Sequence, residues 1–458
     1  MISGTLVAET KSSAAVPTGR LAFGLTQRAL WLLVAGILLV VPAFFLSQFV
    51  WAVAAWDVTV LLVAFFDARQ LPKAKQTQLT RTWITAPALG NATEVELGVV
   101  QEGKQILFCR LMDNLPAAFL ETPEWRALTA YPGVPAKLRY TFAPRVRGDH
   151  ATGNLYLRYR SVIGLVERWA VADLTQTVRI YPAVRPIEEQ SLFLARTRQV
   201  ELQVRKQRQR GHGREFESLR DYREGDDLRD VCWKASARRG LLVSKQHQIE
   251  RSQPVWLMID AGRLLQARVG NYTKLDYATT TAVAMSQLAL VSGDRVGLLA
   301  YGRDTQQVLA PARGRTHLRQ MMEALALVHG EPSEADHLRA TVTLNRLQPR
   351  RSLVLWLTDL AETSMRPEIV DGAAQLMRRH LVLLVAIEQR DLKRIAASRP
   401  QDPKQMFARA AAQELVHWRE VLLARLRERG ALTLETYPED MTASVLNRYL
   451  EIKEKSLL

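Results

Sequence analysis

Two aspartates follow apolar runs that are typical of buried strands. Asp260 comes directly after Val255–Ile259, and Asp359 follows Ser352–Leu357 and Thr358. Ligands of α/β folds lie at the carboxyl ends of parallel strands, so we expect both carboxylates at one edge of a sheet. Oxygen ligands placed there can bind a hard cation such as Mg²⁺. The alternative is that both side chains cap helices or accept hydrogen bonds from loop backbone.

A second charged cluster lies between Gly213 and Gly240. Asp226 and Asp227 are adjacent carboxylates near Cys232, but the segment contains no histidine that could act as a base for this thiol, and adjacent carboxylates in a turn usually cap a helix. Apolar and aromatic anchors between the charges argue against a disordered linker, and 227–238 is expected to form a short helix after a capping turn. We therefore expect a structural or partner-binding role for Arg214, Glu215, Phe216, Arg220, Tyr222, Gly225, Asp226, Asp227, Arg229, Trp233, Lys234 and Arg238.

Other catalytic signatures are missing from the sequence. There is no GxxxxGK[ST] phosphate loop and no HExxH, and the eight histidines are scattered. The two cysteines, Cys109 and Cys232, are far apart, which argues against a disulfide scaffold and fits a reducing compartment. We therefore expect a protein that works by binding rather than by catalysis.

Residues 251–458 show apolar runs that alternate with segments of helical period. Strands are expected at 255–259, 295–301, 352–357, 381–387 and 431–436, with a short edge strand at 306–310. Helices are expected at 277–290, 318–328, 367–379, 402–429 and 441–453. This alternation predicts a mostly parallel, Rossmann-type sheet covered by helices on both faces.

A transmembrane helical hairpin is expected at residues 29–67. The runs Ala29–Leu46 and Phe49–Phe66 are each about 18 residues long, and only Asp57 is charged. Basic residues flank the pair and are absent from its connection, so both termini are expected in the cytoplasm, at a bacterial inner membrane. A cleaved signal peptide and a buried soluble hairpin are the alternatives. The flanking basic residues are Lys11, Arg20, Arg28, Arg69, Lys73 and Lys75.

Short alternating runs separated by turn-forming residues fill the segment 78–182. They predict a β-sandwich, and we expect an immunoglobulin-like architecture that serves as a spacer or interaction module. Residues 1–28 are expected to be a separate cytoplasmic segment.

The formal net charge of +16 suits nucleic acid, anionic lipid or an acidic partner. Part of this charge lies in the linker and charged box at 192–250, where basic residues are dense between Leu192 and Arg214. This stretch is either a contact with anionic lipid headgroups or nucleic acid, or a solvated helix or linker.

Several segments together resemble a bacterial family. The run GREFESLRDYREGDDLRDVCWKASAR resembles the signature of the family catalogued as domain of unknown function 58, and residues 142–148, 161–165 and 180–182 resemble its middle segment. The strand that ends at Asp260, the run SGDRVGLLAYG, the loop Arg313–Thr316 and the run LWLTDL resemble a von Willebrand factor A domain. The resemblance covers nearly the whole chain and implies two membrane helices at its start.

The resemblance also implies a metal site. The complete adhesion-type site begins Asp-x-Ser-x-Ser, whereas this chain has Gly262 and Leu264 in place of the two serines. Thr316 and Asp359 match the remaining positions. A degenerate site of Asp260, Thr316 and Asp359 is therefore implied, which would hold Mg²⁺ weakly or would use Arg263 as its positive charge.

The family's genes often accompany MoxR-type AAA+ ATPases. The resemblance thus implies a membrane-anchored adaptor that works with such an ATPase in the assembly or maturation of other proteins. One alternative is a metal-dependent hydrolase that uses Asp260, Asp359 and carboxylates of the charged box. The other is a nucleic-acid-binding protein that uses the basic linker, which predicts salt-dependent binding.

Overall fold

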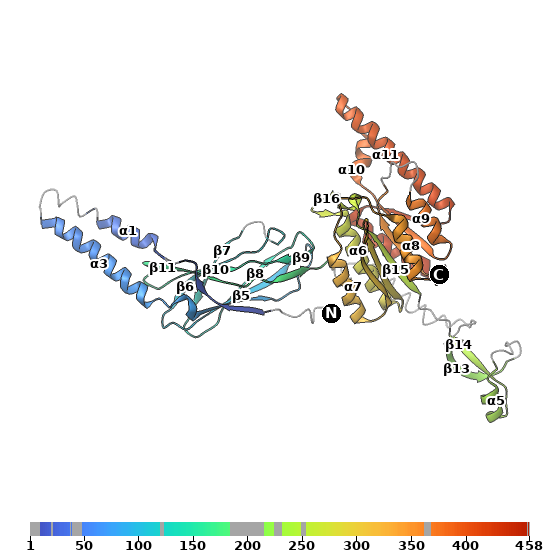
Figure 1. Cartoon of the computed structure of the whole chain (residues 1–458), viewed down its shortest axis with the longest axis horizontal. Coiled ribbons are helices and arrows are strands. Elements are labelled where there is room, and N and C mark those ends of the chain that lie inside the picture. The colour runs from blue at the N-terminus through green and yellow to red at the C-terminus, as the bar shows by residue number, and fades with distance from the viewer. Residues whose placement is uncertain are drawn as a thin grey trace. The chain divides into compact units, whose positions relative to one another are not determined.

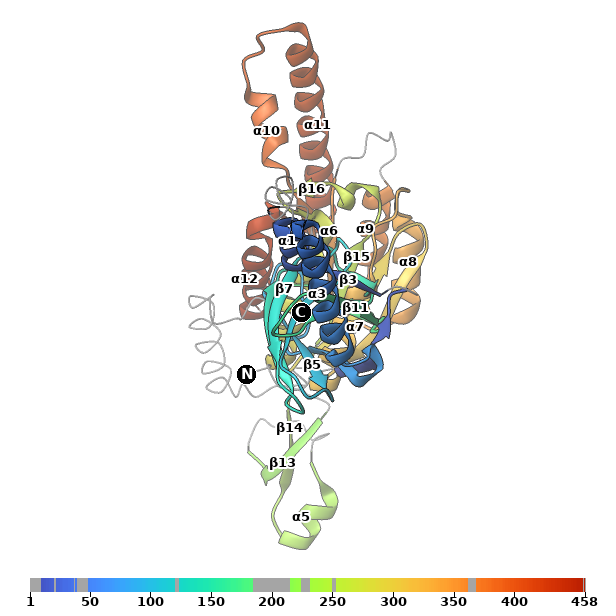
Figure 2. The same ribbon diagram turned by 90° about the vertical axis from the view of Figure 1, so that its left-hand side faces the viewer.

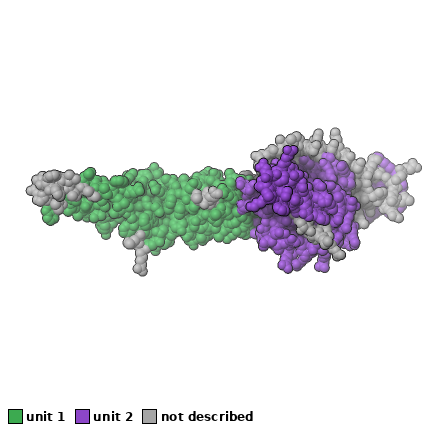
Figure 3. All heavy atoms as spheres, turned by 90° about the horizontal axis from the view of Figure 1, so that it is seen from above, with its two compact units in different colours: residues 1–183 green, residues 184–458 purple. Residues whose placement is uncertain are grey.

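The structure is a computed structural model of the 458-residue chain. It describes residues 10–19, 22–36, 38, 48–119, 123–183, 215–223, 231–248, 253–360, 368–455 and 457. The chain divides into two compact units, residues 1–183 and 184–458 (Figure 3).

The first unit contains two antiparallel sheets. One has the order β1-β4-β5-β8, and the other has the order β2-β11-β10-β6-β7, with β3 also paired to β11. The strands of the first sheet are β1 (Thr10–Ala14), β4 (Thr77–Trp83), β5 (Thr93–Gln101) and β8 (Ala136–Phe142). Those of the second are β2 (Val16–Pro17), β3 (Phe23–Leu25), β6 (Leu107–Asp113), β7 (Trp125–Ala130), β10 (Leu155–Arg160) and β11 (Val166–Ala172). A small pair, β9 (Gly148–Ala151) and β12 (Thr177–Ile180), lies beside them.

The two sheets share one hydrophobic core, so the β-sandwich predicted for residues 78–182 is present. Leu79 and Leu97 of the first sheet are buried in the same cluster as Leu111 and Leu157 of the second, because alternate residues of each strand face inward. A buried ion pair also joins the sheets. Arg81 of β4 donates through Nε to Asp113 at the end of β6 (3.1 Å).

The sandwich begins earlier in the chain than the sequence indicates. Strands β1, β2 and β3 precede the helical pair, and they hydrogen-bond to strands that follow it: Thr10 is paired with Thr82, and Phe23 with Arg168. The expected separate segment 1–28 is therefore part of the sandwich where the structure describes it. The run TKSSA has no apolar alternation that would have marked it as a strand.

Two helices follow β3 and lie side by side (Figure 1). Helix α1 is described as Gln27–Gly36 and α3 as Gln48–Gln70. The indole of Trp56 donates to the carbonyl of Leu32 at 2.8 Å, and Gly36 leaves room for Trp56 and Asp57. Among the described residues, one stretch of helix, Trp51–Gln70, is long and apolar enough to cross a membrane.

The end of α3 is fixed to the sandwich by a buried carboxylate. Asp67 accepts hydrogen bonds from the backbone N–H groups of Leu165 (2.9 Å) and Val166 (3.0 Å) and from the Ser161 hydroxyl. The Arg168 guanidinium donates to the Ala68 carbonyl at 2.8 Å. These contacts attach the helix rigidly to β11 and the loop that precedes it.

The second unit contains a six-stranded sheet of order β19-β18-β15-β20-β21-β22, parallel except for the edge strand β19. Its strands are β15 (Pro254–Asp260), β18 (Arg295–Tyr301), β19 (Thr305–Ala312), β20 (Leu353–Thr358), β21 (Leu381–Ile387) and β22 (Leu432–Thr436). All six expected strands are confirmed, with small shifts at their ends. The parallel strands β15, β18, β20 and β21 are buried on both sides, as continuous apolar runs predict.

Helices cover both faces of this sheet. One face packs against α6 (Lys274–Val291), α7 (Arg315–Leu327) and α12 (Met441–Glu454). The other packs against α8 (His337–Leu347), α9 (Glu368–Met377) and the second half of α11 (Pro403–Glu428). Helix α8 was not expected from the sequence.

A helical arm follows β21. Helix α10 (Arg390–Ala397) and the first half of α11 lie side by side and stand clear of the sheet (Figure 2). Residues 402–408 are all exposed, and Met406 and Phe407 have 55% and 72% of their surface accessible. The aspartate at 402 caps α11 by accepting from the Gln405 N–H at 2.7 Å.

Candidate functional site

Asp260 lies at the carboxyl end of β15, where the sequence predicts it. Its Oδ1 accepts from the Gly262 N–H (2.7 Å) and its Oδ2 from the Thr358 hydroxyl (2.7 Å). The residue is 2% exposed. Burial raises the pKa of Asp260, although both hydrogen bonds act in the opposite direction.

Asp359 lies just after the neighbouring strand β20 and is held from both helix layers. Lys274 of α6 donates from Nζ to Oδ2 at 2.5 Å, and Arg419 of α11 donates from Nη1 to Oδ1 at 2.9 Å. The Leu360 N–H also donates to Oδ1, at 2.7 Å. One carboxylate therefore ties the sheet edge to the helices on its two faces.

Lys274 is a site residue that the sequence reasoning missed. It begins α6, whose first turn is closed by a reciprocal capping box between Thr273 and Asp276. The pattern Thr-x-x-Asp could have placed the start of the helix at this point. Only the fold shows that the lysine, 85 residues before Asp359, lies against it.

A buried aromatic group lies beside the carboxylates. Tyr301 at the end of β18 shares a hydrogen bond with His337 Nδ1 (2.9 Å), and the Trp356 indole donates to the Tyr301 hydroxyl (2.7 Å). The charge of His337 acts on Asp260 and lowers its pKa. Polar and aromatic side chains from three strands and α8 therefore meet at this edge.

Thr316 does not belong to this site, so its assignment from the family pattern is wrong. Strand β19 runs antiparallel to β18 and ends opposite Val296, at the amino-terminal edge of the sheet. The loop after β19 and the start of α7 lie there too, because His317 Nε2 is 2.6 Å from the Val296 carbonyl oxygen. Thr316 is exposed at the edge opposite to Asp260 and Asp359.

The loop between α7 and α8 completes the site at the carboxyl edge of the sheet. The Glu331 N–H donates to the Ala261 carbonyl (2.8 Å), and the Arg263 N–H donates to the Ser333 carbonyl (2.9 Å). A Cβ on Gly262 would lie 2.8 Å from the Ala335 nitrogen. The serine of the complete family pattern therefore has no room at position 262. Arg263 is exposed and paired with Glu334, so it does not supply the charge beside Asp359.

The side chains at this edge do not fit a resident divalent cation. The Lys274 ammonium group is already within 2.5 Å of Asp359, and a second cation there would be repelled. The four carboxylate oxygens of Asp260 and Asp359 each accept at least one hydrogen bond. Within the described ranges, no group of three or more His, Cys, Asp or Glu side chains could hold a metal. The expected Mg²⁺ therefore finds no suitable donor set here.

The charged box forms a β-hairpin with a helix inserted in it. Strand β13 (Glu215–Asp221) pairs with β14 (Val243–Gln248), and α5 (Trp233–Arg239) lies between them in the chain. Glu215, Phe216 and Arg220 are in β13, and Trp233, Lys234 and Arg238 are exposed on α5. Tyr222 is half-buried, and its N–H donates to the Leu242 carbonyl at 2.8 Å. Arg214, Gly225, Asp226, Asp227 and Arg229 lie outside the described residues, as does the basic linker 192–214.

The hairpin differs from the expected helix 227–238. Residues 227–230 of that expectation lie outside the described residues. The described helix begins at Trp233, with strand β13 before it and strand β14 after it in the chain. Cys232 precedes the helix, and its carbonyl accepts from the Ser236 hydroxyl at 3.0 Å. Cys232 therefore lies at the amino terminus of α5.

The topology of the six-stranded sheet indicates the class of its domain. The strand order, the antiparallel edge strand and the aspartate after the first strand define a von Willebrand factor A-like α/β domain. Residues 218–406 match the family described as protein of unknown function DUF58. The family expected from the charged box is thereby confirmed for this part of the chain.

The relatives match the same part of the chain. The uncharacterized protein YeaD of Bacillus subtilis is 25% identical over 197 residues, which are 43% of this chain and 47% of the relative. The uncharacterized protein Rv1480 of Mycobacterium tuberculosis is 30% identical over 190 residues, 40% of this chain and 58% of the relative. The chain thus matches about half the length of these relatives.

Solved structures with some similarity include a von Willebrand domain and a conserved hypothetical bacterial protein. The protein BatB of Bacteroides thetaiotaomicron is 10% identical with a TM-score of 0.29, and covers 44% of this chain and 100% of its own. The von Willebrand domain of the pilus tip protein Mfa5 of Porphyromonas gingivalis is 7% identical with a TM-score of 0.29, and covers 45% and 97%.

Proposed function

We propose that this protein is a membrane-anchored adaptor that works with a MoxR-type AAA+ ATPase in the assembly or maturation of other proteins. The observation that carries the proposal is the helical pair. It exposes apolar side chains along its length, while its end is locked to a folded domain through Asp67. Such an arrangement suits a membrane anchor that is attached to the sandwich.

The anchor is a two-helix transmembrane hairpin in this proposal. Trp51 is 79% exposed, and Leu61, Leu62, Phe65 and Phe66 are exposed as well, as expected of side chains that face lipid. Strands on both sides of the hairpin belong to one sandwich, so both flanks would lie on the same side of a bacterial inner membrane. The basic flanks favour the cytoplasmic side.

The sandwich, which we take as immunoglobulin-like, would act as a rigid spacer. Its buried Arg81–Asp113 pair and common core leave few means of bending between the sheets. The von Willebrand factor A-like domain would then present the partner surface.

The arm is the best candidate for this surface. Two exposed apolar side chains, Met406 and Phe407, lie next to each other near its tip, although neither supports the core. Exposed apolar side chains of this size are typical of contacts with a partner. The buried carboxyl edge at Asp359 would hold the base of the arm, since Arg419 belongs to α11.

Membrane anchoring is tested by extraction. Membranes that contain the full chain are washed with alkaline carbonate and then treated with detergent. The proposal expects the chain to remain in the membrane until detergent is added. Release by carbonate would exclude the anchor.

The adaptor role is tested by capture from solubilised membranes of the native host, with mass spectrometry to detect the ATPase. The variant Met406→Ser/Phe407→Ser is compared with Val342→Ser/Leu347→Ser, which changes two exposed apolar residues of α8. We expect the ATPase with the wild type and the control, and at least about tenfold less with the arm variant, as for a lost apolar hot spot. Absence of the ATPase from the wild type contradicts the adaptor proposal. Equal recovery on all three contradicts the role of the arm.

A further inference from the structure

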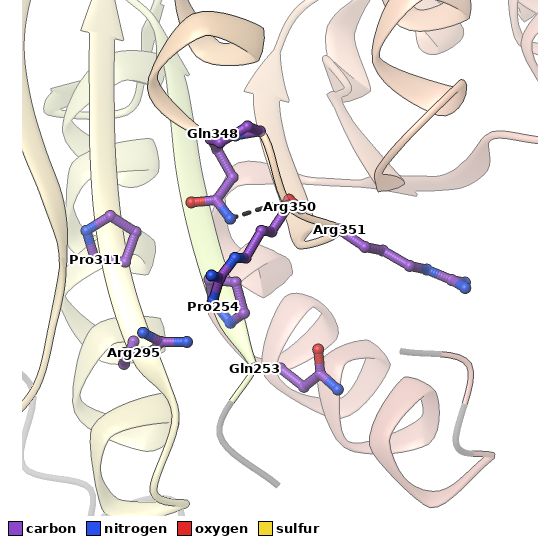
Figure 4. A pocket seen from close by; sticks show the side chains of 8 residues that line it. Gln253, Pro254, Arg295, Pro311, Gln348, Arg350 and Arg351 are labelled. Carbon is purple, nitrogen blue, oxygen red and sulfur yellow. Dashed lines mark hydrogen bonds between the residues drawn. The ribbon is translucent and has the colours of Figure 1, made fainter. Parts of the chain in front are cut away.

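A cavity of ≈400 Å³ opens at the amino-terminal edge of the α/β sheet, opposite the carboxyl edge described above. Three arginines line it: Arg295 at the start of β18, and Arg350 and Arg351 in the loop between α8 and β20 (Figure 4). Pro254 and Pro311 form part of its wall. An arginine-lined cavity is a candidate site for an anion.

The positive charge of this cavity is not balanced by the chain where the structure describes it. None of the three arginines forms an ion pair with a described carboxylate, and Arg295 Nε is buried without a hydrogen-bond partner. Asp294 is adjacent but already engaged: it pairs with Lys453 at 2.8 Å and accepts from the Gln253 N–H at 3.2 Å. An external anion would balance the charge of Arg295, which pairs with no described carboxylate.

Neighbouring loops extend the positive charge. Four exposed arginines lie at this edge, after the end of β19 and before the start of β21. None of the four forms an ion pair within the described residues. They are Arg313, Arg315, Arg378 and Arg379. This edge therefore attracts anions from solution, and the cavity is the place where one can be enclosed.

The loop that carries Arg350 is fixed before any ligand binds. The Trp256 indole donates to Gln348 Oε1 at 3.3 Å, and Gln348 Nε2 donates to the Arg350 carbonyl at 3.0 Å. Figure 4 shows Arg295 and Arg350 extending toward the same opening, whereas Arg351 points away. Arg351 instead donates to the Leu457 carbonyl at 3.0 Å.

We propose that Arg295 and Arg350 bind the phosphate group of a ligand in this cavity. A guanidinium group presents a planar fork of donors, and a tetrahedral phosphate has enough oxygens to accept from two forks at once. A carboxylate has only two oxygens. The phosphate can come from a lipid headgroup or from a free phosphorylated molecule. This site is independent of the adaptor function and of the carboxyl edge.

The test uses the full chain in nanodiscs of phosphatidylcholine, with pyrophosphate as the probe. Phenylglyoxal modifies accessible arginines, and mass spectrometry measures the rate at each one. We expect pyrophosphate at ten times its dissociation constant to slow modification of Arg350 about tenfold. Arg263 and Arg339, which are exposed and paired with acids at the opposite edge, serve as controls and should not change.

Two variants check that the site is built from these residues. Arg350→Gln, an exposed position, should weaken pyrophosphate binding by about tenfold or more, because it removes a charged fork. Arg263→Gln/Arg339→Gln lowers the net charge further but should leave binding unchanged. Equal weakening by both variants, or equal protection of Arg350 and Arg339, would overturn the proposal in favour of unspecific attraction. Lack of saturable binding would overturn it as well.

A change in the lipid composition of the nanodiscs distinguishes the two sources of the phosphate. In nanodiscs that contain phosphatidylglycerol and no pyrophosphate, a slowed modification of Arg350 relative to Arg339 assigns the site to headgroups. An unchanged rate, together with protection by pyrophosphate, assigns it to a free ligand.

Discussion

The Nζ atom of Lys274 lies 2.5 Å from Oδ2 of Asp359, and this ion pair joins helix α6 to the end of strand β20. Both side chains are almost fully buried. In the family pattern this edge of the sheet holds a cation bound to aspartates, whereas here the positive charge comes from the chain itself. The edge is thus a structural junction in which Arg419 supplies the second cation.

Replacement of one partner should destabilise the α/β domain. Lys274→Met leaves Asp359 buried beside a single arginine, and we expect a loss of about 3–5 kcal/mol in the free energy of unfolding. Denaturant titration of the solubilised full chain, followed by tryptophan fluorescence, measures it. Arg339→Met, in an exposed pair with Asp304, is the control and should cost under about 1 kcal/mol. Similar losses for the two variants would contradict a special role for Lys274.

Removal of divalent metal should leave the fold unchanged. Because Lys274 provides the charge beside Asp359, EDTA should not lower the midpoint of thermal unfolding, and added Mg²⁺ should not raise it. The measurement is differential scanning fluorimetry in detergent. A midpoint that falls with EDTA and recovers with Mg²⁺ would show that the metal-free interpretation of this edge is wrong.

Cys109 should be inert in the folded chain. Burial raises the pKa of its thiol to about 12, so that at pH 8 the reactive thiolate is scarce. Iodoacetamide should modify the partly exposed Cys232 first, and Cys109 only after unfolding in urea; peptide mass spectrometry distinguishes them. The folded state keeps a proton that the unfolded thiol loses near pH 9, so this group lowers stability as pH rises from about 9 toward 12. Equal labelling of both thiols in the native chain would contradict the burial.

Asp67→Asn should loosen the helical pair from the sandwich. An asparagine side chain removes the charge that accepts from Leu165 and Val166, and the expected loss is about 2–4 kcal/mol. Limited proteolysis between α3 and β4 together with thermal unfolding would detect it. Asp173→Asn, at an exposed turn that contacts Thr175, is the matched control and should change neither measurement.

The strands of the α/β sheet are predicted well from the sequence because their burial determines their amino-acid composition. Runs such as Val255–Ile259 and Leu381–Ile387 are buried on both faces, so nearly every residue is apolar. The aspartate at 402, followed by proline, likewise placed the start of α11 within one residue. These are local signals, and they do not depend on which elements become neighbours.

The site was harder to predict because it depends on strand direction and on distant contacts. Periodicity identified the edge strand near Gln306–Ala310 but not that it runs antiparallel. The family pattern assigned Thr316 to the metal site, although the antiparallel strand carries it to the opposite edge. Lys274 and Arg419 reach Asp359 only through helix packing on the two faces. In the charged box, strand β13 contains more charged residues than strands usually do, so only the helix was expected.

The strands that precede the helical pair also set the order of events during synthesis. Thr10 cannot pair with Thr82 until the intervening residues, which include both helices, have left the ribosome. The first strands therefore remain unpaired while the hairpin is synthesised. The sandwich forms only after the strands that follow the hairpin have been made. A domain fused before Thr10 would lie next to the edge strand β1. We expect such a fusion to slow the folding of the sandwich before it affects membrane anchoring.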